Sequence, residues 1–201
     1  MQTPTTIEAP PTVVLIPKNR GLAAMAEYAL SLYAPQTPYE RTFVRGEDVP
    51  LLASEVARSG RRLLAFTGED LVQEWIASGR SFDPRITQRS LPWSDPQARY
   101  GKPALCLIGA RDAAIPERGV LRVALCSKDE NLARVYLRTL ERPGLAIEPI
   151  VINGSVEAAI LHNLADFMID VVVTGTTIDE LQLDVKTIVS KSDLAILEAT
   201  S

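Results

Sequence analysis

The sequence has few residues of the kinds that build metal centres and acid–base pairs: a single histidine, His162, and two cysteines, Cys106 and Cys126, among 201 residues. A zinc site requires closely spaced cysteine and histidine ligands, and no such spacing occurs here. Each cysteine lies inside an apolar run, so we expect two buried thiols in strands. His162 lies late in an expected helix, and a histidine general base is not expected.

Long hydrophobic runs and an excess of positive charge are also missing. No apolar run approaches the roughly 18 residues of a membrane helix, and residues 1–11 lack the basic and apolar regions of a signal peptide. We therefore expect a cytoplasmic protein with a flexible tail at residues 1–11 and no membrane partner. The net charge of −4 argues against nucleic acid as a partner, because binding to a phosphate backbone needs a broad basic face. Small phosphorylated substrates are compatible with this charge, since a few lysines, arginines and backbone amides can hold them.

What the sequence does contain is a regular alternation of short β-branched runs with amphipathic stretches. Strands are expected at residues 12–16, 42–45, 63–66, 86–91, 104–108, 120–126, 147–152, 167–173, 187–190 and 195–198. Helices are expected at residues 21–33, 48–58, 69–78, 130–141, 155–164 and 176–183. This alternation is typical of α/β proteins, in which helices cover both faces of a largely parallel sheet.

So many strands in a chain of this length favour two lobes over one sheet. Residues 92–103 are rich in proline, aspartate, glycine and glutamine, and we interpret them as a crossing between lobes. The predicted first lobe comprises residues 12–98 and 178–201, and the second comprises residues 101–177. We predict that each lobe is a mainly parallel sheet flanked by helices, as in periplasmic binding proteins, with a substrate cleft between the lobes.

The segment with the clearest chemical content is the Thr-Gly-Thr-Thr turn at residues 174–177, between an expected strand and an expected helix. Gly175 allows a positive φ and a close approach of the backbone to a ligand. The amides at the helix start can bind a phosphate, and so can the hydroxyls of Thr174, Thr176 and Thr177. The same turn can also be a simple helix cap.

Two carboxylates near this turn favour the binding site over the cap. Asp166 and Asp170 lie at the start and in the middle of the preceding strand, where aspartate is poorly suited to burial unless something binds it. Asp170 can accept hydrogen bonds from ribose hydroxyls, or assist a magnesium ion held mainly by pyrophosphate.

Four blocks of the sequence resemble the ATP phosphoribosyltransferase family, in the family's order. They read Pro-Lys-Asn-Arg-Gly-Leu from residue 17, Val-Arg-Gly-Glu-Asp-Val-Pro from residue 44, Thr-Gly-Glu-Asp-Leu from residue 67, and Asn-Gly-Ser-Val-Glu from residue 153, continued by Asp166, Asp170 and the turn at residues 174–177. The sequence departs from the family after Thr177, where Ile-Asp-Glu-Leu-Gln-Leu replaces the usual Leu-x-x-Asn-Gly-Leu.

The resemblance implies a chemistry and a set of site residues. The family transfers phosphoribosyl from phosphoribosyl pyrophosphate to N1 of the adenine of ATP and releases pyrophosphate, in the first step of histidine biosynthesis, with Mg²⁺ held mainly by substrate. Donor-binding residues implied by the match are Asp166, Asp170, Thr174, Gly175, Thr176 and Thr177. Residues implied for ATP and pyrophosphate are Lys18, Arg20, Arg45, Gly68, Glu69, Asp70, Ser155 and Glu157. The residues expected to be catalytic are Lys18, Arg45 and Asp170.

The resemblance also implies partners. Long forms of the family continue into a regulatory domain beyond the position of Ser201, whereas short forms work with a separate subunit related to histidyl-tRNA synthetase. We therefore expect a homodimer within a hetero-oligomer that contains such a subunit. Two alternatives stay open: a diverged phosphoribosyltransferase with another acceptor, and a non-catalytic two-lobed protein that binds a small ligand.

Overall fold

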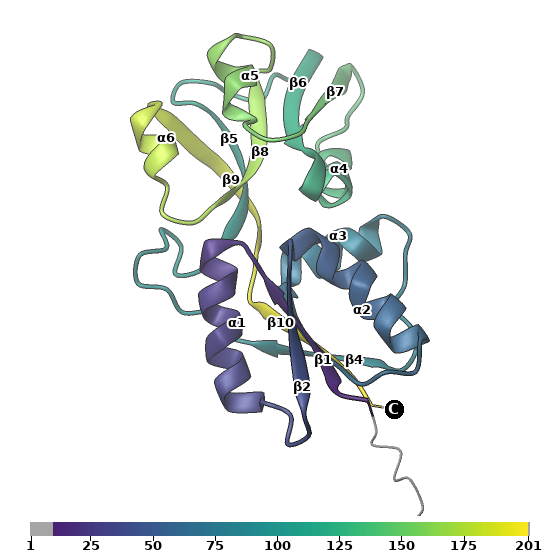
Figure 1. Cartoon of the computed structure of the whole chain (residues 1–201). Coiled ribbons are helices and arrows are strands. Elements are labelled where there is room, and N and C mark those ends of the chain that lie inside the picture. Colours follow the sequence, from purple (N-terminus) through teal and green to yellow (C-terminus); the bar gives the residue numbers. More distant parts are fainter. Residues whose placement is uncertain (1–9, 201) are drawn as a thin grey trace, which may run out of the picture. The chain divides into compact units, whose positions relative to one another are not determined.

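The computed structural model describes residues 10–200, which divide into two compact units, each built on a five-stranded sheet (Figure 1). The first unit takes in residues 10–67, 82–89 and 195–200, and the second takes in residues 68–81 and 90–194. The flexible tail expected at residues 1–11 lies, apart from Pro10 and Pro11, outside the described residues. Across residues 10–200, no helix is long and apolar enough to cross a bilayer.

The sheet of the first unit has the strand order β2-β1-β3-β10-β4. Its strands are β1 (Thr12–Pro17), β2 (Tyr39–Val44), β3 (Leu63–Gly68), β4 (Ile86–Leu91) and β10 (Leu194–Ala199), and its helices are α1 (Arg20–Tyr33), a 3-10 turn (Gly46–Asp48) and α2 (Val49–Arg58). β1 and β3 form because their residues are apolar throughout, and both strands are buried along their whole length. β1 pairs in parallel with β2 on one side and β3 on the other. The connection from β1 through α1 leads to β2 on one side of β1, and the connection from β2 through α2 leads back to β3 on the other side. Because both connections are right-handed, α1 and α2 lie on opposite faces of the sheet (Figure 1).

The sheet of the second unit has the order β7-β6-β8-β5-β9. Its strands are β5 (Ala104–Ala110), β6 (Gly119–Cys126), β7 (Leu145–Ile152), β8 (Phe167–Val172) and β9 (Leu183–Lys191). The helices of this unit are α3 (Glu69–Ala77), α4 (Glu130–Arg138), α5 (Glu157–Leu161) and α6 (Thr176–Glu180), with a 3-10 turn (Ser127–Asp129) before α4. β6 is parallel to β7 and β8, whereas β5 is antiparallel to β8 and β9. This sheet is therefore mixed, and the expectation of mainly parallel strands does not hold for β5, which is antiparallel to both of its neighbours.

The position of β9 also differs from the predicted lobe boundaries. Residues 178–201 were expected to return together to the first lobe, but β9 pairs with β5 along its length and only β10 joins the first sheet. Leu183 and Val185 of β9 pack into the core of the second unit, which explains why the strand stays there. Residues 68–81, which include α3, likewise belong to the second unit rather than the first.

Two apolar layers cover the two faces of the second sheet. Along β5, Ala104, Cys106 and Ile108 pack with α5 and α6, whereas Leu105 and Leu107 pack on the face covered by α4. Both cysteines are buried free thiols, which confirms the expectation from their apolar surroundings. The same alternation along β8 turns Met168, Asp170 and Val172 towards the face covered by α5 and α6.

Helix α3 is fastened to α4 by a single carboxylate. Glu74 accepts hydrogen bonds from the Asn131 amide at 3.0 Å, the Asn131 side chain at 2.6 Å and the Leu132 amide at 2.7 Å. The Asn131 and Leu132 amides are backbone donors of the first turn of α4, which have no partner within the helix, and an anion is favoured there. The cap helps to explain why residues 68–81 belong to the second unit.

Candidate functional site

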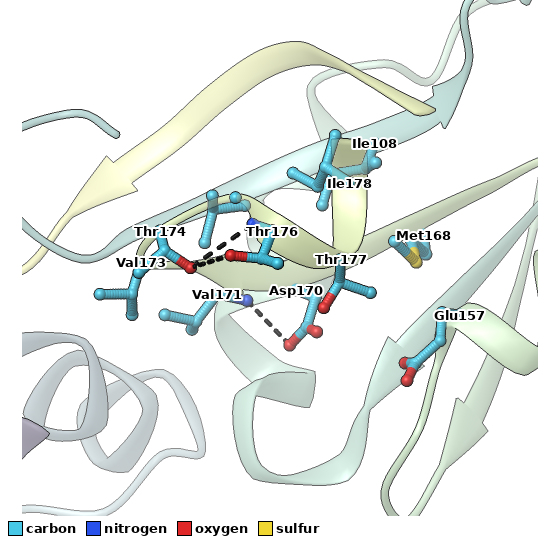
Figure 2. Close-up of a pocket in the computed structure, with 12 residues that line it drawn as sticks. Ile108, Glu157, Met168, Asp170, Val171, Val173, Thr174, Thr176, Thr177 and Ile178 are labelled. Carbon is cyan, nitrogen blue, oxygen red and sulfur yellow. Dashed lines mark hydrogen bonds between the residues drawn. The ribbon is translucent and has the colours of Figure 1, made fainter. Parts of the chain in front are cut away.

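The turn between β8 and α6 has the conformation expected from its glycine. Gly175 has φ +83°, in the left-handed region, where other L-residues are strained. The hydroxyl oxygens of Thr174 and Thr176 lie 2.9 Å apart, and the Thr176 amide points to the Thr174 hydroxyl at 3.4 Å (Figure 2). Both threonines are exposed, so their hydroxyls are open to a ligand.

A cavity of about 240 Å³ lies against this turn. Drug-sized ligands occupy pockets of roughly 300–1,000 Å³, so this cavity suits a smaller molecule, such as a phosphorylated pentose. Its apolar lining includes Ile108, Met168 and Ile178, and its polar lining includes Glu157, Asp170, Thr174, Thr176 and Thr177 (Figure 2). Glu157, the first residue of α5, is thus brought beside the turn, whereas the exposed Ser155 is not part of this lining.

Asp170 is the half-buried carboxylate of the cavity. It projects from β8 on the same face as Met168, and its Oδ1 accepts the Val171 amide at 2.8 Å. Burial raises the pKa of Asp170, and the charge of Glu157 acts in the same direction, whereas the Val171 amide and Lys128 oppose them. A carboxylate with so little solvation is well placed to accept hydrogen bonds from ligand hydroxyls, because these would stabilise its charged form.

The structure does not bring Asp166 to this cavity. Asp166 precedes β8, at the opposite end of the strand from the turn, and both of its oxygens are occupied by Arg122. The Arg122 amide and Nη2 each donate to it at 2.8 Å, and this interaction lowers the pKa of the Asp166 carboxyl. The carboxylate of Asp166 is thus paired within the protein and lies away from the cavity, and the donor-binding role expected of it stays a prediction.

Two charged residues near Asp170 were not anticipated from the sequence. Asp129 ends the 3-10 turn before α4 and is only 1% exposed, and its Oδ2 accepts no hydrogen bond within the described structure. Burial raises the pKa of Asp129 to about 7, although the charge of Lys128, with its Nζ 3.7 Å from Oδ2, opposes the shift. Neither residue carries a recognisable local signal, because their burial depends on how α4 packs.

The structure also places an unexpected arginine, Arg99, against the turn. Its amide donates to the Val173 carbonyl at 2.7 Å, and its Nη1 donates to Asp179 Oδ1 at 2.7 Å. A Cβ built on Gly175 would lie 2.8 Å from both Cδ and Nη1 of Arg99. Arg99 lies within the segment interpreted as a crossing between lobes, and nothing in its local sequence links it to a turn more than seventy residues later.

In the first unit, Lys18 and Arg45 follow neighbouring parallel strands and so lie at one edge of the sheet. The Lys18 amide donates to Val44 O at 2.7 Å, and the Gly46 amide donates to Asn19 Oδ1 at 2.9 Å, which ties the two turns together. The Lys18 and Arg45 side chains are exposed. Arg20 begins α1, and the role expected of its side chain lies outside what the structure describes.

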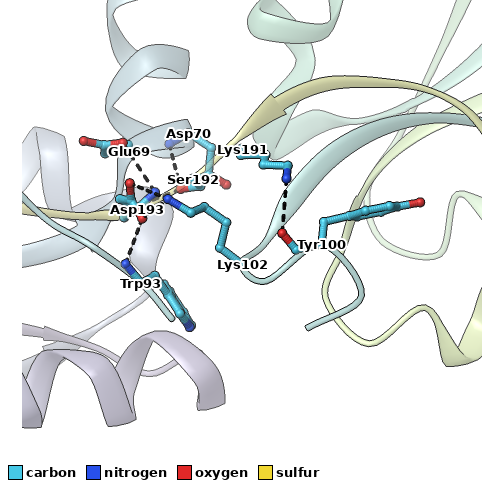
Figure 3. Close-up of polar contacts among 8 residues, drawn as sticks. All are labelled: Glu69, Asp70, Trp93, Tyr100, Lys102, Lys191, Ser192 and Asp193. Carbon is cyan, nitrogen blue, oxygen red and sulfur yellow. Dashed lines mark hydrogen bonds and ion pairs between the residues drawn. The ribbon is translucent and has the colours of Figure 1, made fainter. Parts of the chain in front are cut away.

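Gly68, Glu69 and Asp70 do not line the cavity. Glu69 and Asp70 instead form hydrogen bonds with Ser192 and Asp193 (Figure 3). Ser192 Oγ donates to Asp70 Oδ1 at 2.7 Å, and the Glu69 amide donates to Asp193 O at 2.9 Å. A Cβ on Gly68 would collide with the Asp70 carboxylate. These three residues therefore fix the segment between β9 and β10, and the structure gives no support to their expected contact with ATP.

Within residues 10–200, no group of three or more histidine, cysteine, aspartate or glutamate side chains is placed to hold a metal ion. The carboxylates of Asp170 and Glu157 line one cavity, and two carboxylates suit a magnesium ion that is bound mainly through substrate phosphates.

Comparison with known proteins decides the family. The ATP phosphoribosyltransferase family model matches residues 45–200, which include the cavity and its turn. The chain belongs to the ATP phosphoribosyltransferase family. An ATP phosphoribosyltransferase from Thermococcus gammatolerans is 30% identical over 176 residues, covering 82% of this chain and 76% of that protein. Family membership confirms the resemblance read from the four sequence blocks.

The extent of the match varies among relatives of this family. Matches to the ATP phosphoribosyltransferases of Dictyoglomus thermophilum and Clostridium acetobutylicum, at 33% and 44% identity, span 40% and 31% of this chain but only 38% and 27% of the length of those proteins.

Solved structures confirm the fold of this family member. The ATP phosphoribosyl transferase (HisG:HisZ) complex from Thermotoga maritima matches with a TM-score of 0.65 and 21% identity, covering 94% of this chain and 87% of that one. The periplasmic aliphatic sulphonate binding protein SsuA from Escherichia coli matches with a TM-score of 0.55 and 15% identity, covering 94% and 61%. Two lobes of mixed sheet flanked by helices, like those of periplasmic binding proteins, are thus the architecture of this chain.

Proposed function

We propose that this protein transfers phosphoribosyl from phosphoribosyl pyrophosphate to N1 of the adenine of ATP and releases pyrophosphate, the first step of histidine biosynthesis. The observation that carries the proposal is the cavity that joins Asp170 and Glu157 to the turn at residues 174–177, inside the segment matched by the family. The volume and polarity of this cavity suit the phosphoribosyl half of the donor.

The turn would bind the 5′-phosphate of the donor, and Asp170 would bind its ribose. Helix α6 has only five residues, so its dipole contributes little, and binding would rest on direct hydrogen bonds from the turn amides and the hydroxyls of Thr174, Thr176 and Thr177. Asp170 accepts one backbone amide and has capacity for ribose hydroxyls. The apolar side chains opposite would exclude water from the sugar.

The reaction requires the protein to position the two substrates and to stabilise the charges that develop on them, and it needs no protein nucleophile. A bond forms between N1 of adenine and C1′ of the ribose, while the bond between C1′ and the pyrophosphate oxygen breaks. C1′ gains positive character in this step and the leaving pyrophosphate gains negative charge. The carboxylate of Asp170 would favour the first, and the exposed cations Lys18 and Arg45 would bind the polyphosphate groups.

Magnesium fits this chemistry as a cofactor carried by the substrate. Asp170 and Glu157 are the residues that would assist in holding it, because Mg²⁺ is commonly bound by one or two carboxylates together with substrate phosphates. When bound, it supplies positive charge beside the pyrophosphate.

We further propose that the chain works as a short-form catalytic subunit in the cytoplasm, where ATP is available. The sequence resemblance supports a homodimer within a hetero-oligomer that includes a subunit related to histidyl-tRNA synthetase. Co-elution of the two purified proteins, and a rise in turnover on mixing them, would support this partner. A chain that never co-elutes with such a subunit and is fully active alone would contradict it.

A pyrophosphate-release assay tests the reaction. With phosphoribosyl pyrophosphate and Mg²⁺, release should depend on added ATP, and the nucleotide product should carry the ribosyl group on N1. Release that depends on another base but not on ATP would identify a phosphoribosyltransferase with a different acceptor. Failure to bind the donor in calorimetry would contradict the whole assignment and favour a small-ligand-binding protein.

A further inference from the structure

We propose that Arg99 is a ligand of the donor 5′-phosphate and sets the preference of this site for a phosphorylated sugar. The inference rests on the proposed function only in that the cavity is taken to receive a phosphoribosyl group. Arg99 lies outside the four sequence blocks that resemble the family, in the segment of residues 92–103.

The first support is where the side chain lies. Gly175 is buried although Thr174 and Thr176 on either side of it are exposed, and the side chain of Arg99 packs against its Cα, with Cδ and Nη1 2.8 Å from the position of a Cβ. Gly175 itself lines the cavity. The guanidinium is therefore held next to the backbone amides that would contact the phosphate.

The second support is that the loop carrying Arg99 is ordered by its own hydrogen bonds. Asp95 receives the Gln97 amide on its side chain at 2.8 Å, and its own amide donates to Gly101 O at 3.0 Å. Ala98 is buried, and the ring of Tyr100 packs against the core beneath the cavity. Lys191 Nζ donates to Tyr100 O at 3.2 Å (Figure 3). A backbone held on both sides of Arg99 does not need to become ordered when a ligand binds.

The third support is the charge balance of the cavity. The described residues that line it include the carboxylates of Asp170 and Glu157 but no lysine or arginine. A phosphate with about two negative charges entering such a site needs a neighbouring cation. Burial and then the charge of Asp170 raise the pKa of Cys106, the β5 neighbour of Asp170, to about 11, and the charges of Arg99 and Lys191 oppose this shift.

The present partner of Arg99 is one that a phosphate can replace. The side chains of Arg99 and Asp179 are 36% and 66% exposed, and ion pairs this open to solvent contribute little to stability. A phosphate offers three oxygens to the planar guanidinium and a higher charge than a carboxylate. We therefore expect Arg99 to exchange Asp179 for the 5′-phosphate when the donor binds.

The test is calorimetric titration with ribose 5-phosphate, which carries the 5′-phosphate and lacks pyrophosphate. Arg99→Gln should weaken its binding at least tenfold and raise the donor KM with a smaller effect on kcat. The matched control is Arg111→Gln, which breaks another exposed arginine–aspartate pair of the same unit, Arg111–Asp184 at 3.8 Å, and should leave binding unchanged. Thermal melting of each variant verifies that it is folded.

Asp179→Asn separates a ligand from a structural ion pair. If Arg99 serves the phosphate, removal of its competing partner should leave ribose 5-phosphate binding unchanged or make it tighter. Equal weakening by Arg99→Gln and Asp179→Asn would overturn the inference, and so would an Arg99→Gln affinity within twofold of the wild type or a wild-type chain that binds no ribose 5-phosphate. A wild type that binds ribose 5-phosphate through Arg99 but releases no pyrophosphate with ATP would instead overturn only the proposed function.

Discussion

Asp166 lies directly before strand β8 and Asp170 lies within it, and the two carboxylates have different hydrogen-bond partners. Both carboxylate oxygens of Asp166 accept hydrogen bonds from Arg122, which lowers the pKa of Asp166. Asp170 is half-buried and accepts one backbone amide, and burial raises its pKa. The first aspartate is satisfied within the protein. The second faces the cavity and has capacity to accept further hydrogen bonds from a ligand, so we expect Asp170 rather than Asp166 to serve the proposed reaction.

Replacing Asp170 should give the largest loss of activity. Asp170→Asn keeps the shape and removes the charge that favours positive character at C1′, so kcat/KM should fall about a thousandfold, or ~4 kcal/mol. Stability should hold or rise slightly, because a poorly solvated charge is removed. Steady-state kinetics and denaturant unfolding measure both effects. Normal activity in a folded Asp170→Asn variant would erase the distinction between the two aspartates.

Asp129 extends the comparison to a buried carboxylate whose Oδ2 accepts no hydrogen bond from residues 10–200. Its pKa is raised from 3.8 to about 7, so between these values the native state keeps a proton that the unfolded chain releases. The wild type should therefore lose stability as pH rises from about 4 to 7, by about 3 kcal/mol relative to Asp129→Asn. Urea unfolding at several pH values measures the difference, with the exposed Asp112→Asn as control. Parallel curves for wild type and Asp129→Asn would contradict the raised pKa of Asp129.

Asp166→Asn should show the opposite pattern from Asp170→Asn. Activity per folded molecule should be kept, while stability at neutral pH falls by about 1 kcal/mol, a small value because solvent screens this partly exposed pair. A carboxyl with a lowered pKa stabilises the native state above its unfolded pKa and loses that contribution as pH falls through the folded pKa. The stabilities of the wild type and Asp166→Asn should hence converge in acid. A loss of donor affinity in Asp166→Asn would restore the role first expected for it.

The smallest stability effect is expected at the cationic turns of the first unit. Lys18→Ala or Arg45→Ala should leave the melting temperature nearly unchanged, since exposed charges contribute little to folding. Activity should nevertheless fall about tenfold if these side chains bind polyphosphate. A variant that melts early but works normally per folded molecule would show that the turn is structural.

The sequence was a good guide to elements whose pattern is local. Continuous apolar runs predicted β1, β3 and β5, and the glycine between threonines predicted the turn conformation at residue 175. Helices α5 and α6 are shorter than expected, since hydrophobic spacing does not mark where a short helix ends. The assignment of β9 depended on antiparallel pairing with β5, which no local pattern encodes.

The site was harder to predict than the fold because partners decide the role of a charged residue. Nothing near Asp166 in the sequence indicates Arg122, 44 residues earlier, so Asp166 and Asp170 could not be told apart. Arg99 was overlooked for the same reason, since its pairing with Asp179 spans 80 residues. Glu157 was named only through the family resemblance, as a residue for ATP and pyrophosphate, and that role stays a prediction although the residue lines the cavity.

The burial of both thiols has a practical consequence for observing this protein at work. Cys106 is inaccessible and its pKa is raised to about 11, so at neutral pH an alkylating reagent reaches it only when β5 opens. The rate of Cys106 alkylation therefore measures how often β5, the strand beside Asp170, opens. A molecule bound in the cavity should lower this rate of alkylation. A fluorophore on an engineered surface cysteine would meanwhile report on the native protein without background from either natural thiol.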